Sequence, residues 1–309
     1  MTITSRFLWT ALVIALLAFV PFVLPGYLTS LATLVLIYAL LAMSVDILAG
    51  YAGRTPLCHG AIFGTATYVA MYYVTAAEGN PWLALPLGIA AALAVALIFA
   101  LLAVRTSGVY FLLLTLALGM IVWGVCQRWT SVTGGENGLR GQVRPDAVAD
   151  PVRFYYFVLF VGLVATFVMW RFVHSPFGLT LKGIRESESR MRSLGYNTTH
   201  HLLIGFLFSG LIAGLSGVLY AYFNSFVSPS NVALAQSVKG LLMVIVGGVG
   251  TLFGGFVGAA VIIMLENVVS SFTERWSMVL GVLFMLTMIF APEGVVGKFR
   301  AYLAKRHHP

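Results

Sequence analysis

Charged residues are scarce in this sequence. The 309 residues include 18 lysines and arginines and 10 aspartates and glutamates, so that charged residues make up 9% of the chain. A soluble domain carries about a quarter charged residues. Hydrophobic residues make up 60% of this chain, and its mean hydropathy is +0.96. The composition excludes a water-soluble protein and indicates an integral membrane protein.

Motifs for catalysis, nucleotide binding and metal binding are also missing. The string GVVGKF at 294–299 lacks the G-x-x-x-x-G-K-[ST] spacing of a phosphate-binding loop. No H-E-x-x-H occurs, and the two adjacent histidine pairs do not share a helical face as metal ligands would. The two cysteines, Cys58 and Cys126, imply no disulfide framework. We expect no catalytic residues, no metal and no cofactor.

Long apolar runs dominate what is present. A helix needs about 20 mostly apolar residues to span a bilayer, and continuous runs favour helices over a barrel. No small-residue cleavage site follows the run that begins at Phe7, so we interpret it as an uncleaved first span. The sequence predicts one all-α transmembrane domain over 1–309, a polytopic bundle of about ten helices, some interrupted. The expected spans cover residues 7–25, 28–50, 57–77, 82–104, 108–127, 154–173, 201–223, 230–248, 254–270 and 277–292.

Lysine and arginine are unevenly divided between the loops of this topology. With the N-terminus inside, twelve basic residues fall on the cytoplasmic side and five on the outer side, and Lys239 falls within a span. Cytoplasmic loops carry the excess of positive charge in membrane proteins. The count predicts that both termini and a loop at about 174–200 are cytoplasmic. The loop at about 128–153 is then extracytoplasmic.

The segment KGIRESESRMRSLGYNTTHH at 182–201 is the most polar stretch between two apolar runs. Two pairs with glutamate four residues before arginine favour a helix over 184–195, and Gly195 is placed as its C-terminal stop. The pairs are Glu186–Arg190 and Glu188–Arg192, and the apolar face consists of Ile184, Met191 and Leu194. From the pattern alone, this amphipathic helix either docks onto a cytoplasmic partner or lies flat on the lipid surface.

Two glycine-rich strings repeat a pattern, each in its own half of the chain. GAIFGTATYVAM at 60–71 and GTLFGGFVGAAV at 250–261 share G-x-x-F-G followed by small residues. Paired interrupted helices surround the substrate path in repeat-built transporters, whereas small residues at this spacing are also common where helices pack closely in lipid. Spacing alone favours packing, as it does for the small-residue string FSGLIAGLSGVLYA at 208–221.

Three charged side chains in the expected spans are singled out as candidates for function, namely Asp46, Lys239 and Glu266. A charge in hydrocarbon is costly and usually marks function, but Asp46 and Glu266 lie near span ends, where they can cap or snorkel. A proton-driven carrier would show more carboxylates at mid-depth. The sequence therefore weakens that interpretation.

Seven strings occur in an order that resembles a known family. They are GYAGRTPLCHGAIFGTATY (50–68), RTSGVYFLLLTLALG (105–119), TSVTGGENGL (130–139), GIRESESRMRSLGYN (183–197), SGLIAGLSGVLYA (209–221), LLMVIVGGVGTLFGGFVGAA (241–260) and FAPEGVVG (290–297). Across nearly the whole chain they resemble the LivM-type branched-chain amino acid permease family of ABC importers. The resemblance implies a multi-pass permease of the bacterial inner membrane that does no chemistry. It also implies four partners: a second similar permease, two cytoplasmic ABC ATPases and an extracytoplasmic substrate-binding protein.

Candidate site residues lie within the matching strings. The resemblance makes 182–197 the loop that couples the permease to its ATPases, with Glu186, Glu188, Arg190, Met191, Leu194 and Gly195 as candidate contacts. Candidates for the translocation path or for helix contact are Gly60, Phe63, Gly64, Thr115, Gly250 and Gly254. Candidates for extracytoplasmic docking are Thr133, Gly134, Gly135 and Asn137.

The chain departs from the family pattern at five positions. Asp46 replaces a neutral amide, Arg54 and Pro56 replace uncharged polar residues, Cys58 replaces glycine, and Lys239 stands where an acidic residue is common. Several of these lie beside the expected path, so the cargo stays open. Branched-chain or other small hydrophobic amino acids lead, and urea, short amides and aromatic carboxylates are the alternatives within the family. An ion-coupled carrier or a channel working alone is the alternative from another class.

The topology predicts the sides of two polar loops. Single cysteines at Ser131 and Ser189, in a chain lacking Cys58 and Cys126, should react from opposite sides of the membrane. An impermeant thiol reagent should label position 131 in intact cells and position 189 only in inverted vesicles. Labelling of both positions in intact cells would contradict the cytoplasmic assignment of 174–200.

Overall fold

The protein is a bundle of helices. The computed structural model describes residues 15–23 and 25–272, with a few single positions between 278 and 297. The span expected at 7–25 lies only partly within these residues, and the one at 277–292 lies almost wholly outside them. In the described part, six segments are long and apolar enough to cross a membrane.

Helices cover the eight other spans expected from the sequence. The long ones are α2 (Gly26–Asp46), continued by the π-helix η1 (Ile47–Tyr51), α4 (Pro81–Ala103), α5 (Gly108–Arg128), α7 (Pro151–Val173) and α10 (Thr198–Asn224). Shorter apolar helices are α3 (His59–Thr75), α11 (Leu234–Gly247) and α12 (Gly254–Ser270). The remaining elements are α6 (Thr130–Thr133), η2 (Gly135–Asn137), β1 (Leu139–Arg140), η3 (Asp146–Val148), α8 (Pro176–Glu186), α9 (Glu188–Ser193), β2 (Phe226–Val227) and η4 (Pro229–Asn231). The expected fold class, an all-α membrane protein with interrupted helices, is confirmed.

Capping residues followed by proline begin several helices. The Asp150 carboxylate accepts hydrogen bonds from two backbone N–H groups of the first turn of α7, both at 3.1 Å. Pro151 follows at the first helical position, where no N–H is required. Asn80 and Ser175 begin α4 and α8 in the same way. These caps satisfy N–H groups that a helix leaves without an internal partner.

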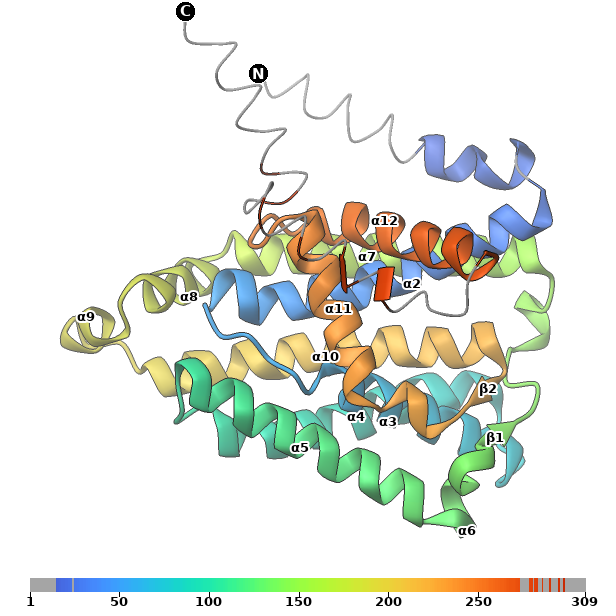
Figure 1. The fold of residues 1–309 in the computed structure, drawn as a ribbon, viewed down its shortest axis with the longest axis horizontal. Helices are drawn as coiled ribbons and strands as arrows, with labels where there is room; N and C mark the ends of the chain where they lie inside the picture. The colour runs from blue at the N-terminus through green and yellow to red at the C-terminus, as the bar shows by residue number, and fades with distance from the viewer. Residues whose placement is uncertain are drawn as a thin grey trace, which may run out of the picture.

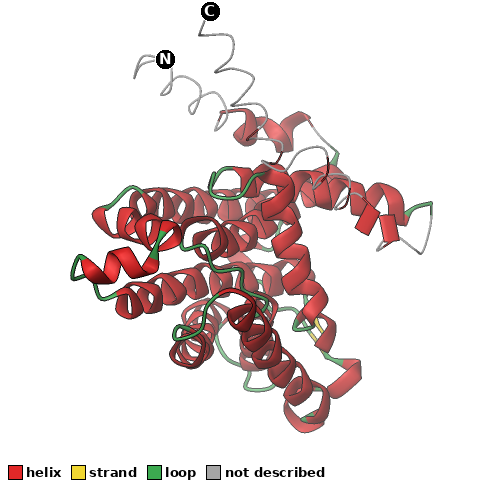
Figure 2. Ribbon diagram, turned by 60° about the vertical axis from the view of Figure 1, so that its left-hand side comes forward, coloured by secondary structure: helices red, strands yellow, loops and turns green. Residues whose placement is uncertain are grey.

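The long helices run roughly side by side, and polar elements lie at the two ends of the bundle. Figure 1 shows α8 and α9 projecting at one end, with α6, β1 and β2 at the opposite end. The two strands pair antiparallel, Leu139 with Val227, and Figure 2 shows helix almost everywhere else in the described part. α11 crosses the direction of α2, α10 and α12 steeply (Figure 1).

Small residues bring α10 close to its neighbours. A Cβ added at Gly214 would lie 2.5 Å from the Ala92 side chain on α4, and one at Gly217 would lie 3.0 Å from Ala66 on α3. Lipid chains are as apolar as leucine, so close van der Waals packing rather than water exclusion holds such helices together. The packing interpretation of the 208–221 string is confirmed.

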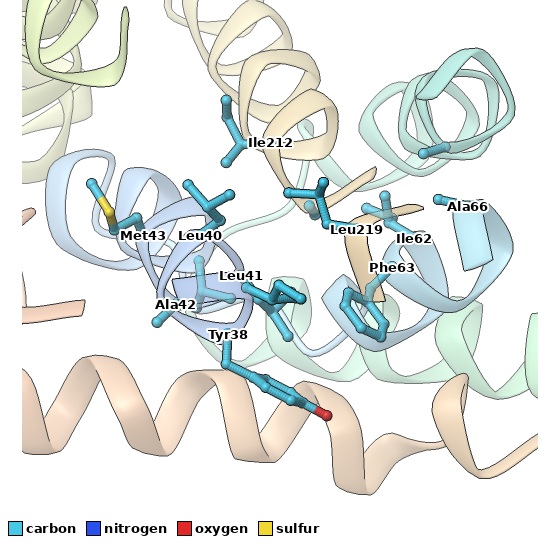
Figure 3. Close-up of a cluster of buried hydrophobic side chains, with 14 of the residues drawn as sticks. Tyr38, Leu40, Leu41, Ala42, Met43, Ile62, Phe63, Ala66, Ile212 and Leu219 are labelled. Atoms are coloured by element: carbon cyan, nitrogen blue, oxygen red, sulfur yellow. The ribbon is translucent and has the colours of Figure 1, made fainter. Parts of the chain in front are cut away.

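The buried cluster at the centre comes mainly from α2, α3 and α10. Figure 3 shows Leu40, Leu41 and Met43 from α2 beside Ile62 and Leu219 from the other two helices. All five side chains are fully buried. Tight packing here holds α2 and α3 in a fixed relation, and the polar segment between them forms the candidate site.

Gly64 should be indispensable for the contact between α3 and the start of α11. An added Cβ would lie 2.5 Å from Val232 Cγ2 and 2.9 Å from the Asn231 carbonyl oxygen. Gly64→Ala should therefore destabilise the complex by about 1–3 kcal/mol, because backbone has to move to accept it. The measurement is the thermal midpoint of the purified complex in detergent.

Gly162→Ala in α7 is the matched control, since a Cβ there has nothing within 4 Å. It should leave the midpoint unchanged or raise it slightly, because alanine favours a helix over glycine. Equal midpoints for the two variants would show that the α3–α11 contact is not tight.

Candidate functional site

The charged segment forms two short helices instead of one. α8 ends at Glu186 and α9 begins at Glu188, because Ser187 adopts an extended conformation with φ −163° and ψ 100°. The Ser187 hydroxyl accepts a hydrogen bond from the Arg190 N–H at 3.4 Å and caps α9. The single helix predicted over 184–195 is therefore wrong. A serine that can cap a helix competes with the helical conformation at its own position.

Of the two expected ion pairs, only Glu188–Arg192 forms. The Arg192 guanidinium lies 2.6 Å from a Glu188 oxygen, whereas the Glu186–Arg190 pair straddles the break at Ser187. The three apolar residues also separate. Ile184 is buried, Met191 is half-buried and Leu194 is 67% exposed. The expected common apolar face does not exist.

Glu188 is the centre of the polar contacts at this end of the bundle. Its second carboxylate oxygen lies 2.7 Å from Arg54 Nη2, in the segment between η1 and α3. The Thr198 hydroxyl, at the start of α10, donates to Glu188 at 3.2 Å. One carboxylate thus ties α9 to two other parts of the chain.

Arg54 is a cation held almost entirely inside the protein. Its side chain is 6% exposed and its guanidinium lies 5.7 Å from the centroid of the Phe111 ring on α5. Burial lowers the pKa of the Arg54 guanidinium, and the Glu188 carboxylate raises it again. A buried cation needs such a partner, so Arg54 and Glu188 depend on each other.

Residues 182, 185 and 188, at intervals of three positions, hold α8 and α9 against the segment between α2 and α3. The Lys182 ammonium lies 5.2 Å from the centroid of the Tyr51 ring, and Arg185 donates a hydrogen bond to the Gly50 carbonyl. Glu188 adds the contact with Arg54. We call residues 46–58 the hinge segment, because it joins α2 to α3 and includes the π-helix.

The hinge segment continues this contact into the bundle through Asp46. One Asp46 oxygen accepts from the Gly250 N–H at 2.7 Å, and the other accepts from the Leu252 N–H at 3.1 Å. Both residues have positive φ, 76° at Gly250 and 52° at Leu252. For leucine this conformation is strained. The Asp46 carboxylate therefore holds a strained loop between α11 and α12.

Further hydrogen bonds fix the far end of the hinge segment. The Leu57 N–H donates to the Thr115 hydroxyl of α5 at 3.1 Å, and the Gly60 N–H donates to Ser237 of α11 at 2.8 Å. The buried ring of His59 lies 2.7 Å from the Ser209 hydroxyl. The hydroxyl of Thr115, a candidate path residue, thus accepts a hydrogen bond from a backbone N–H group.

The two G-x-x-F-G strings both contact α11, one at each end. A Cβ added at Gly60 would meet Ser237 and Gln236 in the first turn of α11, and one at Gly64 would meet Asn231 and Val232 just before α11. Gly254 faces the Gly247 carbonyl oxygen, 2.8 Å from an added Cβ. Gly250 lies beside Gly50 in the loop held by Asp46. Phe63 is buried in the central cluster. The close approach supplies a packing reason for these glycines, and their role in a substrate path stays a prediction.

The turn after α9 exposes two large side chains. Leu194 is 67% and Tyr196 is 45% exposed. Gly195 has φ +87°, and the N–H groups of Gly195 and Tyr196 donate to the last turn of α9, to Arg192 and Met191, at 3.0 and 3.1 Å. These are the two bonds of a Schellman motif. The expected C-terminal stop at Gly195 is confirmed.

Met191 turns towards α8 rather than outwards. Its sulfur would lie 2.7 Å from a Cβ added at Gly183. Met191 therefore holds α9 against α8, and Leu194 is the apolar side chain that a partner can reach.

The docking candidates at the opposite end mainly shape a turn. The buried Thr133 hydroxyl donates to the Cys126 carbonyl at 2.6 Å. Gly134 and Gly135 have positive φ, 73° and 57°. Of the four candidates, Asn137 is the one that is exposed.

Comparison with known proteins identifies the family. The family model described as the permease component of branched-chain amino acid transport systems matches residues 27–289. The chain belongs to this family. It is 27% identical to the LivM permease proteins of the high-affinity branched-chain amino acid transport systems of Salmonella typhimurium and Escherichia coli, over 98% of this chain and 77% of each relative. A tyrosine transport system permease protein of Clostridioides difficile is 32% identical over 36% of this chain and 38% of its own length. No solved structure matches the sequence.

The family match confirms the resemblance drawn from the seven strings. The protein is a multi-pass transport permease component. Within the described residues, no group of three or more histidine, cysteine, aspartate or glutamate side chains could hold a metal ion.

Sequence reasoning did not find the hinge contacts. It noted Asp46 and Arg54 as departures from the family pattern, but Arg54 and Glu188 are 134 positions apart. Lys182 and Arg185 belong to the polar string 182–201, whose spacing indicates no partner for either of them. The useful signal was the unusual charge at position 54, since a cation in an apolar setting requires a partner.

Glu188 and Glu186 should behave differently despite their proximity. Glu188→Gln removes the carboxylate from the buried Arg54 and should loosen the hinge segment, whereas Glu186 is exposed. The reporter is Cys58, which is fully buried. In a Cys126→Ser background, Glu188→Gln should raise the rate of Cys58 alkylation about ten-fold, the size expected for a lost charged hydrogen bond. Glu186→Gln is the control and should leave the rate unchanged. Equal rates would mean that Glu188 does not hold the hinge segment.

Proposed function

We propose that the protein is the translocation subunit of an ABC uptake transporter for amino acids, driven by partner ATPases through α8 and α9. One observation carries the proposal. The helices that project from the bundle end in exposed apolar side chains, and Lys182, Arg185 and Glu188 bind the hinge segment. A force applied at Leu194 would therefore be passed on to the interrupted part of α2.

The proposed partners are based on the missing phosphate-binding loop and on the apolar side chains that the helices expose. Its sequence holds no phosphate-binding loop, so in this proposal ATP is hydrolysed by other subunits. α5 exposes many large apolar side chains, among them Tyr110, Leu113 and Ile121, which suits lipid or a second similar permease. With the N-terminus inside, α8 and α9 lie in the cytoplasm with two ATPases, in the bacterial inner membrane. The 128–153 loop then faces an extracytoplasmic binding protein.

The cargo is an amino acid in this proposal. The relatives' names support it: two belong to branched-chain amino acid transport systems and one to a tyrosine transport system. Branched-chain amino acids are the first candidates for the cargo, because the similarity to permeases of branched-chain amino acid transport systems covers nearly the whole chain.

The coupling role can be tested at Leu194. Leu194→Asp should abolish retention of the ATPases during purification of the complex and reduce ATP-driven uptake. Burying a leucine side chain contributes about 1.5–3 kcal/mol, and a single rim charge contributes about 0–1 kcal/mol. Arg190→Ala is therefore the control and should retain most of the ATPase. Both variants are compared at equal membrane levels and equal pairing with the second permease.

A surface helix lying on lipid predicts the reverse. Arg190 and Arg192 would then matter most, and Leu194→Asp would leave ATPase retention unchanged. Uptake that continues without ATP or ATPase subunits would instead support a carrier working alone.

A further inference from the structure

A further ion pair lies within the bundle, on helices other than α8 and α9. The Lys239 ammonium of α11 is 2.5 Å from a carboxylate oxygen of Glu266 on α12, and the two side chains are 13% and 23% exposed. Taking two charges out of water costs about as much as their attraction returns, so apolar residues can often replace such a pair without loss. Helix packing alone therefore gives little reason for this pair.

The same ammonium lies against an aromatic cluster. Lys239 Nζ is 4.4 Å from the centroid of the Tyr38 ring. The ring centroids of Tyr38, Phe63 and Tyr220 are 5.3 to 6.1 Å apart, and Gln236 donates to the Tyr38 hydroxyl at 3.1 Å. Figure 3 shows Tyr38 projecting away from the aliphatic side chains around it. Lys239, Tyr220 and Glu266 are partly exposed, whereas Tyr38 and Phe63 are 4% and 0% exposed. The ion pair and the Tyr220 ring can therefore be reached from outside the core.

The position of the cluster also suits a transported molecule. Tyr38 lies in the middle of the span Gly26–Tyr51, and Lys239 lies in α11, which both glycine-rich strings contact. Interrupted helices and binding at mid-depth occur together in repeat-built transporters. A charge at this depth is costly and usually functional.

We propose that Lys239, Glu266 and the aromatic cluster bind the zwitterion of an amino acid with an apolar or aromatic side chain. Lys239 binds the substrate carboxylate and Glu266 binds its ammonium group. The Tyr220 ring, which packs on the buried rings of Tyr38 and Phe63, contacts its side chain. When the substrate binds, the Lys239–Glu266 pair is replaced by two pairs, Lys239 with the substrate carboxylate and Glu266 with the substrate ammonium group. The net charge of the site stays the same, because the substrate has zero net charge. An amine or a carboxylate anion alone would leave one protein charge without a partner, which is unfavourable at low dielectric. This inference rests on the proposed transport function.

The test is ligand-induced stabilisation of the whole complex, purified with both permeases and both ATPases. The probes are L-leucine, L-tyrosine, tyramine, which lacks the carboxylate, and 3-(4-hydroxyphenyl)propionate, which lacks the amine. We expect L-leucine or L-tyrosine to raise the thermal midpoint and the two truncated probes to leave it unchanged. Lys239→Met with Glu266→Met removes both charges together, so neither is left unpaired. In this variant the amino acid should no longer raise the thermal midpoint, and the rate of uptake should fall at least about ten-fold.

The matched control places methionine one residue away on each helix, Val238→Met with Leu265→Met, and should keep the shift. The proposal is overturned by a shift that persists in the Lys239–Glu266 double variant. It is equally overturned by truncated probes that stabilise as well as the amino acid, or by no shift with any probe. Failure of the coupling proposal would be recorded separately, as unchanged ATPase retention in the Leu194→Asp variant.

Discussion

Backbone groups that leave a helix inside an apolar bundle have to find partners within the protein, because lipid offers none. In the part of the chain that the structure describes, the regular α-helix is interrupted inside the bundle at residues 47–58 and at 248–253, and several polar side chains make hydrogen bonds there. Asp46 accepts two N–H groups of the second interruption, while Thr115 and Ser237 accept N–H groups at the end of the first. Arg185 satisfies a carbonyl. The sparse polarity of the sequence is concentrated where the helices are broken.

The hydrogen bonds that satisfy backbone groups at the helix interruptions also connect segments that are distant in the sequence. α8 and α9 contact the hinge segment, and the first residue of that segment, Asp46, holds the loop that follows α11. Packed helices move as rigid units, so displacement is taken up where helical hydrogen bonds are missing. Under the proposed function, the interruptions are therefore the places where movement of an ATPase can be converted into movement of helices.

Much of the fold could be predicted from the sequence, because span length and hydropathy are local properties. Eight expected spans coincide with helices, and Gly195 ends α9 as its position suggested. The break at Ser187 was missed, since the Glu–Arg spacing favours a helix and the competing serine cap is a weak signal. Contacts between distant positions were beyond reach. Nothing near Glu188 indicates Arg54, and nothing near Met191 shows that Gly183 makes room for its side chain.

The intramembrane charges are another case in which the sequence indicates the residues but not their partners. The sequence singled out Asp46, Lys239 and Glu266 because charge in hydrocarbon is costly, but it could not assign their partners. In the structure, Asp46 binds backbone N–H groups and the other two bind each other. The difference matters physically. A carboxylate that holds strained backbone cannot let go without loss of local structure, whereas a lysine and a glutamate can separate if each receives another partner of opposite charge. Of the three, only the Lys239–Glu266 pair is therefore suited to exchange with a charged group that passes through the bundle.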